Sequence, residues 1–312
     1  MKTPQNVTST ATKIGIAILL LFGIALIALV SAGMILLFSG TESSFGANVA
    51  IIPIEGVIVA SGESSTFGES VVTSDDIIEW IAKAEENAAI KAVVFRINSP
   101  GGTAVGSDEI ATAIKEMEKP SVAVIREVGA SGAYWVASAT DHVVANRMSI
   151  TGSIGVVSSY LSFGRLLDRY NVTYNQLTAG ERKDVGTPLR ELEPDERDFL
   201  QGKLDAIHHY FIVAVAENRN MTYDRAKELA TGEFSLGYEA KENGLIDALG
   251  GEREALEWID TTLKIEPVAV VYEREPSLIE LLTGVTSGAG KPTLERALRD
   301  ASVEEGGVPM AR

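Results

Sequence analysis

The feature that most constrains the fold is a regular alternation of apolar strand patterns with amphipathic helix patterns over residues 48–127. Patterns rich in β-branched residues occur at 48–60, 91–97 and 121–127, and patterns with helical spacing occur between them at 74–87 and 107–119. A strand, a helix and a second strand in succession form a crossover unit whose two strands run parallel within one sheet. The sequence therefore predicts an α/β fold in which helices cover a parallel sheet.

The pattern is less regular further along the chain. Residues 141–147 and 153–159 are expected to be strands, and residues 161–170 a helix. A long amphipathic helix is expected from Glu193 to about Glu217, followed by shorter helical pieces at 221–230 and 238–251 that end at a pair of glycines. We expect one domain over residues 47–274 and a loosely ordered tail over 275–312, because the tail is rich in Gly, Pro and charge.

Residues 14–38 contain no charged side chain. At 1.5 Å per residue these 25 positions would form a helix of roughly 37 Å, enough to cross a bilayer with some tilt. The apolar part of a cleaved signal peptide is shorter, about 7 to 15 residues. The sequence therefore predicts an uncleaved transmembrane signal anchor at 14–38, after a cytoplasmic N-terminus at 1–13 and before a polar linker at 39–46.

The charges on either side of this segment predict its orientation. Lys2 and Lys13 precede it without any acidic residue, whereas the formal charge of the whole chain is −16, so residues 39–312 carry −18. The positive-inside rule places the N-terminus in the cytoplasm and the main domain on the other side of the cell membrane. Such an acidic domain is not expected to bind nucleic acid, and we interpret its charge as serving solubility.

Ser131 is the first candidate for chemistry. It is flanked by Gly129, Ala130, Gly132 and Ala133, so no bulky neighbour shields its hydroxyl, and an apolar run rich in helix formers follows. A serine hydroxyl is a poor nucleophile until a base accepts its proton. The sequence therefore raises the question of which base is available.

The composition restricts that base to a few residues. The chain has no cysteine, which excludes thiol chemistry, disulfides and cysteine metal sites, and it has three histidines, His142, His208 and His209. His142 lies at the start of an expected strand only eleven positions after Ser131, and the other two lie in the long expected helix, so we interpret all three as solvated or capping residues. A lysine is the alternative, because burial can lower its pKa enough for the neutral amine to accept a proton.

Two glycine clusters support a catalytic interpretation. INSPGG (97–102) ends a strand and places Gly101 and Gly102 where backbone N–H groups can face a ligand, and ITGSIG (150–155) brackets a second serine, Ser153, with glycines. Glycines beside strands usually form turns, so neither cluster is decisive alone. Together with GASGA at 129–133 they form a set of three glycine-containing motifs.

This set resembles the signal peptide peptidase A family in its short, membrane-anchored form. The resemblance rests on INSPGG, VGASGAYWVASATD, ITGSIGV, GERKDVGTP and GYEAKENGLIDALGG in this order, and it covers about residues 48–265. It implies the ClpP/crotonase-like fold, with the expected anchor preceding it. It also implies peptide substrates, remnant signal peptides among them, a ring-like homo-oligomer, and no metal or cofactor.

The resemblance also implies roles for individual residues. Ser131 matches the family nucleophile, Lys183 the general base, and Ser153 a serine that orients the lysine. Gly102 and Gly132 would supply the N–H groups of an oxyanion hole by analogy with the fold. The resulting expectation is a membrane-anchored serine endopeptidase that uses a Ser-Lys dyad on apolar peptides.

Two other functions remain open at this point. A crotonase-type acyl-CoA enzyme would use the same paired N–H groups on a thioester, although the anchor and the Ser131 motif argue against it. A non-enzymatic membrane scaffold would need the glycines only for turns.

Overall fold

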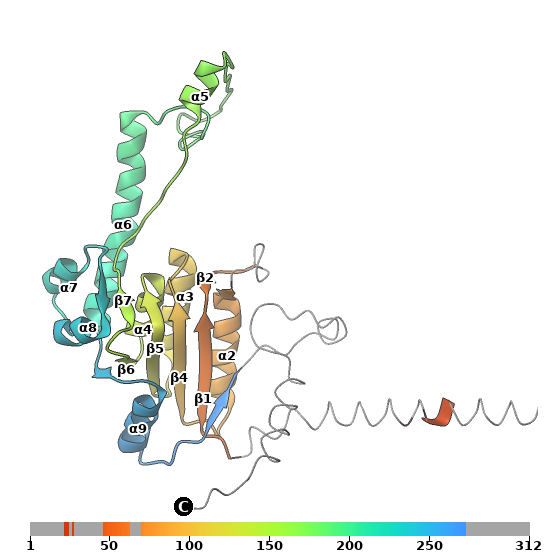
Figure 1. The fold of residues 1–312 in the computed structure, drawn as a ribbon, viewed down its shortest axis with the longest axis vertical. Coiled ribbons are helices and arrows are strands. Elements are labelled where there is room, and N and C mark those ends of the chain that lie inside the picture. Colours follow the sequence, from red (N-terminus) through yellow and green to blue (C-terminus); the bar gives the residue numbers. More distant parts are fainter. Residues whose placement is uncertain (1–21, 25–26, 28–45, 63–69, 273–312) are drawn as a thin grey trace, which may run out of the picture. The chain divides into compact units, whose positions relative to one another are not determined.

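The computed structural model describes residues 22–24, 27, 46–62 and 70–272 (Figure 1). The chain divides into two compact units, Met1–Ala47 and Asn48–Arg312. The anchor expected at 14–38 lies outside the described residues except for 22–24 and 27, and the tail expected at 275–312 lies wholly outside them. None of the helices in the described part of the chain is both long and apolar enough to cross a bilayer.

Most strands of the second unit form one sheet. Its main path runs β10-β1-β4-β5-β6-β9, and every neighbouring pair along this path is parallel. The strands are β1 (Val49–Glu55), β4 (Ala92–Ser99), β5 (Ser121–Ala130), β6 (His142–Ala145), β9 (Ala248–Leu249) and β10 (Ala269–Val271). The predicted mixed α/β fold with a parallel sheet is confirmed.

Helices cover both faces of this sheet, as Figure 1 shows. The helices α2 (Ser74–Glu86), α3 (Ala104–Glu116) and α4 (Gly132–Ser138) pack on one face, against side chains such as Ile52, Phe95 and Ile97. On the other face, α9 (Glu252–Leu263) packs against the alternate side chains, such as Ile51 and Val94. Burial on both faces explains why these strands read as continuous apolar runs.

Strand β5 changes its partner halfway along one edge. Val122–Ile125 pair with β6, whereas Val128–Ala130 pair with β7 (Ile150–Gly152), which in turn pairs antiparallel with β8 (Phe234–Leu236). A small second sheet joins β2 (Val57–Val59) to β3 (Val71–Thr73), and Ile58 bridges to Gly102. The two sheets therefore meet near the C-terminal ends of β4 and β5.

The prediction of a strand at 153–159 is wrong. The strand is β7, at Ile150–Gly152, and the chain has no regular secondary structure from Ser153 to Phe163. The cause is local: Ser153 has a left-handed backbone, with φ of +52°, and its N–H donates to Glu233 O at 3.0 Å instead of continuing the ladder. The helix predicted at 161–170 exists but is shorter, as α5 (Gly164–Arg169).

The long predicted helix is α6 (Pro194–Asn218), which begins with a proline at its first turn. Figure 1 shows it extending away from the sheet, with α5 and the segment around it beyond its first residues. Its buried side chains are mostly near its C-terminal end, where Phe211, Ile212 and Val215 join the core. The helix predicted at 221–230 is confirmed as α7 (Tyr223–Leu229). The helix predicted at 238–251 is shorter, as α8 (Gly237–Asn243), because Gly244 has a left-handed backbone that ends it and residues 248–249 form the strand β9.

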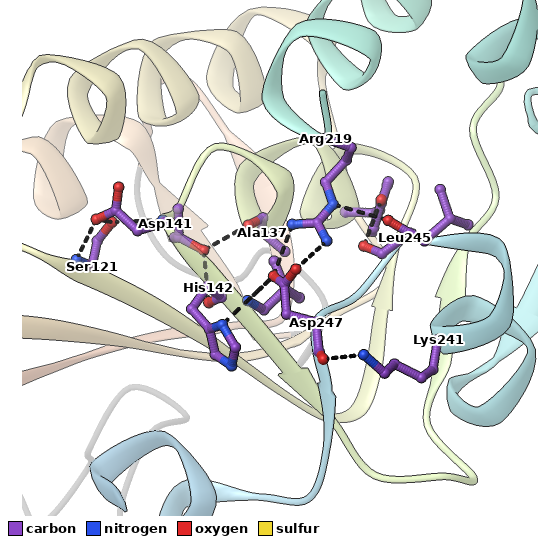
Figure 2. A network of polar contacts seen from close by, with 12 residues as sticks. Ser121, Ala137, Asp141, His142, Arg219, Lys241, Leu245 and Asp247 are labelled. Carbon is purple, nitrogen blue, oxygen red and sulfur yellow. Dashed lines mark hydrogen bonds and ion pairs between the residues drawn. The ribbon is translucent and has the colours of Figure 1, made fainter. Parts of the chain in front are cut away.

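A polar network joins the C-terminal end of α6 to the sheet (Figure 2). Arg219 donates from its two terminal nitrogens to both carboxylate oxygens of Asp247, at 2.9 and 2.7 Å, and from Nε to Gly244 O at 3.2 Å. Asp247 also accepts the N–H of Val143 in β6 at 2.8 Å. The Tyr134 hydroxyl, from α4, donates to Leu245 O at 2.8 Å, so one network ties α4, α6 and β6 together.

Asp247 is expected to make stability depend on pH. Burial alone would raise the pKa of Asp247, but the hydrogen bonds and charge of Arg219 outweigh burial and lower this pKa below its usual value. A carboxylate with a lowered folded-state pKa stabilises the fold above its unfolded pKa of about 3.9, and this contribution is lost as the pH falls through the folded-state value.

We predict that Asp247→Asn lowers the free energy of unfolding by about 2 to 4 kcal/mol near neutral pH, because it leaves the Arg219 guanidinium with 7% side-chain exposure and without its counter-charge. The difference from the parent chain should shrink below about pH 4, where the Asp247 carboxylate of the parent becomes protonated. Urea unfolding at a series of pH values measures it. The control is Glu257→Gln, which breaks an exposed pair with Arg253 and should change stability little. A difference that keeps growing as the pH falls below about 4 would contradict the prediction.

Candidate active site

Ser131 lies at the sharp turn between β5 and α4. Its backbone has a positive φ of 54°, which is unusual for a residue with a side chain. Its N–H donates to Gly152 O at 2.8 Å, and its carbonyl accepts the N–H groups of Tyr134 and Trp135, which start α4. The half-buried Ser131 is therefore fixed by its backbone on both sides, at the end of a buried strand.

The predicted glycine turn packs directly against this serine. Gly101 has φ of +101°, and a Cβ atom on it would lie 2.8 Å from Gly132 N and 3.0 Å from Ser131 Cβ. A Cβ atom on Gly102 would lie 1.9 Å from Ile58 O, and one on Gly132 would lie 2.2 Å from Ser107 Oγ and 3.3 Å from Gly102 N. Side chains are therefore excluded at all three glycines, and the two turns contact each other through their backbones.

This packing leaves two backbone donors free. Within the part of the chain that the structure describes, neither the Gly102 N–H nor the Gly132 N–H donates a hydrogen bond. Gly132 is the first residue of α4, where the helix itself offers no acceptor for the N–H. Two such donors beside a serine form an arrangement that can bind a negatively charged oxygen.

Ser153 is also close to Ser131. It directly follows Gly152, whose carbonyl accepts the Ser131 N–H, so β7 places the two serines at neighbouring strand ends. The Ser153 hydroxyl donates to Gly232 O at 3.2 Å. The structure therefore brings together Ser131, Ser153, Gly102 and Gly132, four of the five candidate residues.

Lys183 is not part of this cluster. It is exposed, and its amine makes no hydrogen bond or ion pair within the described residues. Its neighbour Asp184 accepts from Arg190 Nε and from Arg190 Nη2, at 3.0 and 2.8 Å, and Arg190 also binds Glu196 in the first turn of α6. These hydrogen bonds lower the pKa values of Asp184 and Glu196 below their usual range, so both stay charged as partners of the arginine.

The length of α6 separates Lys183 from Ser131. Arg182, beside Lys183, lies over the Phe199 ring at 5.0 Å, near the start of the helix. Phe211 stacks on Trp135 of α4, with ring centroids 4.8 Å apart, near its other end. Twelve residues of helix between the two phenylalanines span about 18 Å. Within one chain, the structure therefore does not bring Lys183 to Ser131.

The histidines have other partners. His142 stacks on Trp258 at 4.9 Å, its Nδ1 lies 3.9 Å from Asp247, and burial lowers its pKa below the usual value. His209 Nδ1 lies 2.9 Å from the Tyr223 hydroxyl, and His208 Nε2 has no partner among the described residues. None of these contacts involves Ser131. Among the described residues, no group of three or more His, Cys, Asp or Glu is placed to hold a metal ion.

Sequence reasoning missed two residues that support the site. The buried Ser99 hydroxyl accepts the Gly101 N–H at 3.1 Å and so holds the glycine turn, and the buried Ser107 lies directly against Gly132. The only signal for Ser99 is its place before Pro100 in the INSPGG motif. Ser107 gives no signal, because the sequence alone does not reveal that α3 and α4 touch there.

Comparisons with known proteins decide the family. The model of peptidase family S49 matches residues 113–266. A putative signal peptide peptidase SppA from Enterococcus faecium is 31% identical over 74% of this chain and 68% of its own length. The chain belongs to peptidase family S49.

Two further relatives of this S49 peptidase have similar coverage. The putative protease slr0021 of Synechocystis is 36% identical over 65% of this chain and 75% of its own, and the putative protease MJ0651 of Methanocaldococcus jannaschii is 31% identical over 69% and 70%. Together with the family match, they identify the chain as a serine protease and not as an acyl-CoA enzyme or a scaffold. A solved membrane-bound stomatin-specific protease, 14% identical, has a TM-score of 0.47 over 74% of this chain and 100% of its own.

We predict that Gly101→Ala lowers kcat/KM at least tenfold, about 1.4 kcal/mol in the barrier, because the methyl group would collide with Gly132 N and displace the free donors. The positive φ adds strain of about 1 to 3 kcal/mol to the folded state. The matched control is Gly202→Ala in α6, where a Cβ atom meets nothing within 4 Å; it should keep activity and gain about 0.5 to 1 kcal/mol of stability. Peptide hydrolysis and thermal unfolding measure both, and an equally active Gly101→Ala would contradict the prediction.

Proposed function

We propose that this S49 peptidase is an endopeptidase in which Ser131 is the nucleophile, Lys183 the general base and Ser153 the residue that orients the lysine. The observation that carries the proposal is the packing of the Gly101–Gly102 turn against Ser131 and Gly132. This packing places two unpaired backbone donors beside a serine hydroxyl. It resembles the oxyanion holes of the ClpP/crotonase-like fold, to which we assign the domain.

In the proposed reaction, Ser131 Oγ attacks the carbonyl carbon of the peptide bond while Lys183 Nζ, in its neutral form, accepts the hydroxyl proton. The Gly102 and Gly132 N–H groups stabilise the negative oxygen of the tetrahedral intermediate. As the intermediate collapses, the C–N bond breaks and the lysine donates the proton to the leaving amine. Water, deprotonated by the same lysine, then hydrolyses the acyl-enzyme and restores Ser131.

The position of Lys183 favours a site shared between two subunits. About 18 Å of α6 separates the lysine segment from α4, so the lysine would serve the Ser131 of a neighbouring chain. The segment that carries Lys183 exposes several large apolar side chains, among them Val157, Leu161, Leu166, Tyr170 and Leu177. Contacts between copies would cover these side chains and bury the lysine, consistent with a ring-like homo-oligomer.

The substrates we propose are apolar peptides, remnant signal peptides among them. The Enterococcus relative is named as a putative signal peptide peptidase, and the uncharged run at 14–38 would hold the domain at the membrane where such peptides remain. The charge asymmetry around this run favours a cytoplasmic N-terminus and a catalytic domain on the outer side.

Replacing the nucleophile tests the assignment directly. We predict that Ser131→Ala lowers peptide hydrolysis by several orders of magnitude and abolishes labelling by a fluorophosphonate probe, because the attacking oxygen is removed. Stability should not fall, since only one hydroxyl is lost from a site surrounded by small residues. Ser70→Ala, at an exposed serine outside the candidate site, should keep both activity and labelling. Undiminished labelling of the Ser131→Ala chain would refute the assignment.

Mixing two inactive chains tests the shared site. Co-expressed Ser131→Ala and Lys183→Ala chains should regain roughly a quarter of the parent activity, because about one interface in four of a randomly assembled ring pairs an intact serine with an intact lysine. A dyad within one chain would leave every site broken. The control replaces the Lys183→Ala partner by a chain with both substitutions, and it should stay inactive. Verified mixed oligomers without activity would exclude the shared site.

A further inference from the structure

Helix α6 contacts α4, which follows Ser131, near its C-terminal end and the segment of Lys183 at its N-terminal end. Its C-terminal end is held by the stack of Phe211 on Trp135 and by the hydrogen bond from Asn218 Nδ2 to Ser138 Oγ at 3.1 Å. Both partners, Trp135 and Ser138, belong to α4, the helix that Ser131 precedes. The exposed remainder of α6 extends away from these contacts (Figure 1).

The other end of α6 holds the lysine segment through charged pairs. Arg190 bridges Asp184, beside Lys183, to Glu196 in the first turn of the helix, at 2.8 and 2.7 Å. Arg182, on the other side of Lys183, lies 3.8 Å from Asp195. The position of Lys183 is therefore set by the start of α6.

At the C-terminal end of α6, the contact between Arg219 and Asp247 orients the helix relative to the sheet. The guanidinium of Arg219, at the C-cap of α6, makes a two-pronged contact with the Asp247 carboxylate, as Figure 2 shows. Asp247 is fixed to the sheet in turn, because its carboxylate accepts the Val143 N–H and its own N–H donates to Val143 O, both at 2.8 Å. A planar fork on a carboxylate fixes orientation as well as distance, which a single hydrogen bond does not.

A small change in the helix angle at this contact produces a large displacement at the lysine segment. From Arg219 to Glu196 the helix spans about 35 Å, so a tilt of about 5° at its C-terminal end moves its first turn by about 3 Å. Misplacing a catalytic group by about 1 Å can cost a hundredfold in rate. The contact between Arg219 and Asp247 includes neither Ser131 nor Lys183, and it lies at the end of the helix about which such a tilt would turn.

We propose that Arg219 and Asp247 are positioning residues for the catalytic lysine, acting through the direction of α6. The inference rests on the proposed role of Lys183 as general base. It predicts that loosening the fork spreads the positions of the lysine segment while the body of the domain stays folded.

The first test measures the direction of α6 without measuring activity. The chain has no cysteine, so Lys115→Cys on α3 and Asp198→Cys near the start of α6, both exposed, introduce a single pair of spin labels. Labelled chains are diluted with unlabelled ones so that distances within one chain dominate. Arg219→Lys, which keeps the charge but loses the fork, should broaden or shift the distance distribution, and Asp247→Asn should do the same.

The control for this measurement is Ile77→Val, which removes a methylene group from the buried face of α2 and leaves α6 untouched. Its distance distribution should match that of the parent chain. If Arg219→Lys also left the distribution unchanged, the inference would be overturned. If Asp247→Asn fails to fold, Arg219→Lys alone decides.

The second test asks which catalytic group the fork positions. Arg219→Lys is placed either in a Ser131→Ala chain, which contributes the lysine, or in a Lys183→Ala chain, which contributes the serine, and each is mixed with the complementary inactive chain. We expect kcat to fall tenfold to a hundredfold, with KM nearly unchanged, only when the substitution is in the chain that supplies Lys183. An equal fall in both mixtures would show that the fork acts through α4 instead and would overturn the inference.

The unsubstituted mixture of Ser131→Ala and Lys183→Ala chains separates this inference from the shared site. If that mixture is inactive, the shared site fails. The distance distribution and the kcat of uniform Arg219→Lys oligomers then decide the inference by themselves: an unchanged distribution or an unchanged kcat overturns it.

Discussion

The change of partner along strand β5 is the constraint on which the site depends. The first half of β5 pairs with β6, and its last three residues pair with β7 along the same edge. Buried hydroxyls hold this branch: Ser149 Oγ donates to Ile125 O at 3.3 Å, and Thr151 Oγ1 donates to Gly129 O at 2.8 Å. Because β7 ends beside β5, Gly152 O receives the Ser131 N–H, and Ser153 follows one residue later.

The same branch separates two parts of the domain with different tasks. β7 ends beside the serines and the glycine turn. β6 contacts Asp247, which in turn binds Arg219 at the end of α6. Helix α4 contacts both parts, since it starts at Ser131 and its Tyr134 hydroxyl reaches Leu245 O. Ser131, the proposed nucleophile, thus follows the part of β5 that pairs with β7, whereas α6, which holds the segment of the proposed base Lys183, ends against β6. The polar network of Figure 2 joins α6 to the sheet.

Local patterns were sufficient for the centre of the fold. β4, β5, α2 and α3 were predictable because apolar runs and helical spacing are properties of a few neighbouring residues. The short edge strands β8, β9 and β10 were not, since each owes its pairing to partners remote in the chain. Helix α9 was missed, although Glu252 and Glu254 after a glycine pair are typical of a helix start.

The candidate site also contains residues that local motifs reveal and one, Lys183, whose place depends on contacts remote in the chain. Ser131, Ser153 and the glycines stand in short motifs at strand ends, so the sequence predicted a cluster that the structure contains. The place of Lys183 depends on a 25-residue helix and on ion pairs at its far end, which no motif around the lysine encodes. The sequence therefore identifies the two residues of the proposed dyad but does not predict where Lys183 lies relative to Ser131.

The positive φ of Ser131 affects which residue evolution would favour at this position. A residue with a Cβ is strained in this conformation, and glycine adopts it freely, so the fold by itself would favour glycine at position 131. Selection for stability alone would replace the serine, and the proposed role of its oxygen as the nucleophile is what opposes this replacement. Descendants that no longer cleave peptides should therefore tend to carry glycine here, with the surrounding fold intact and slightly more stable.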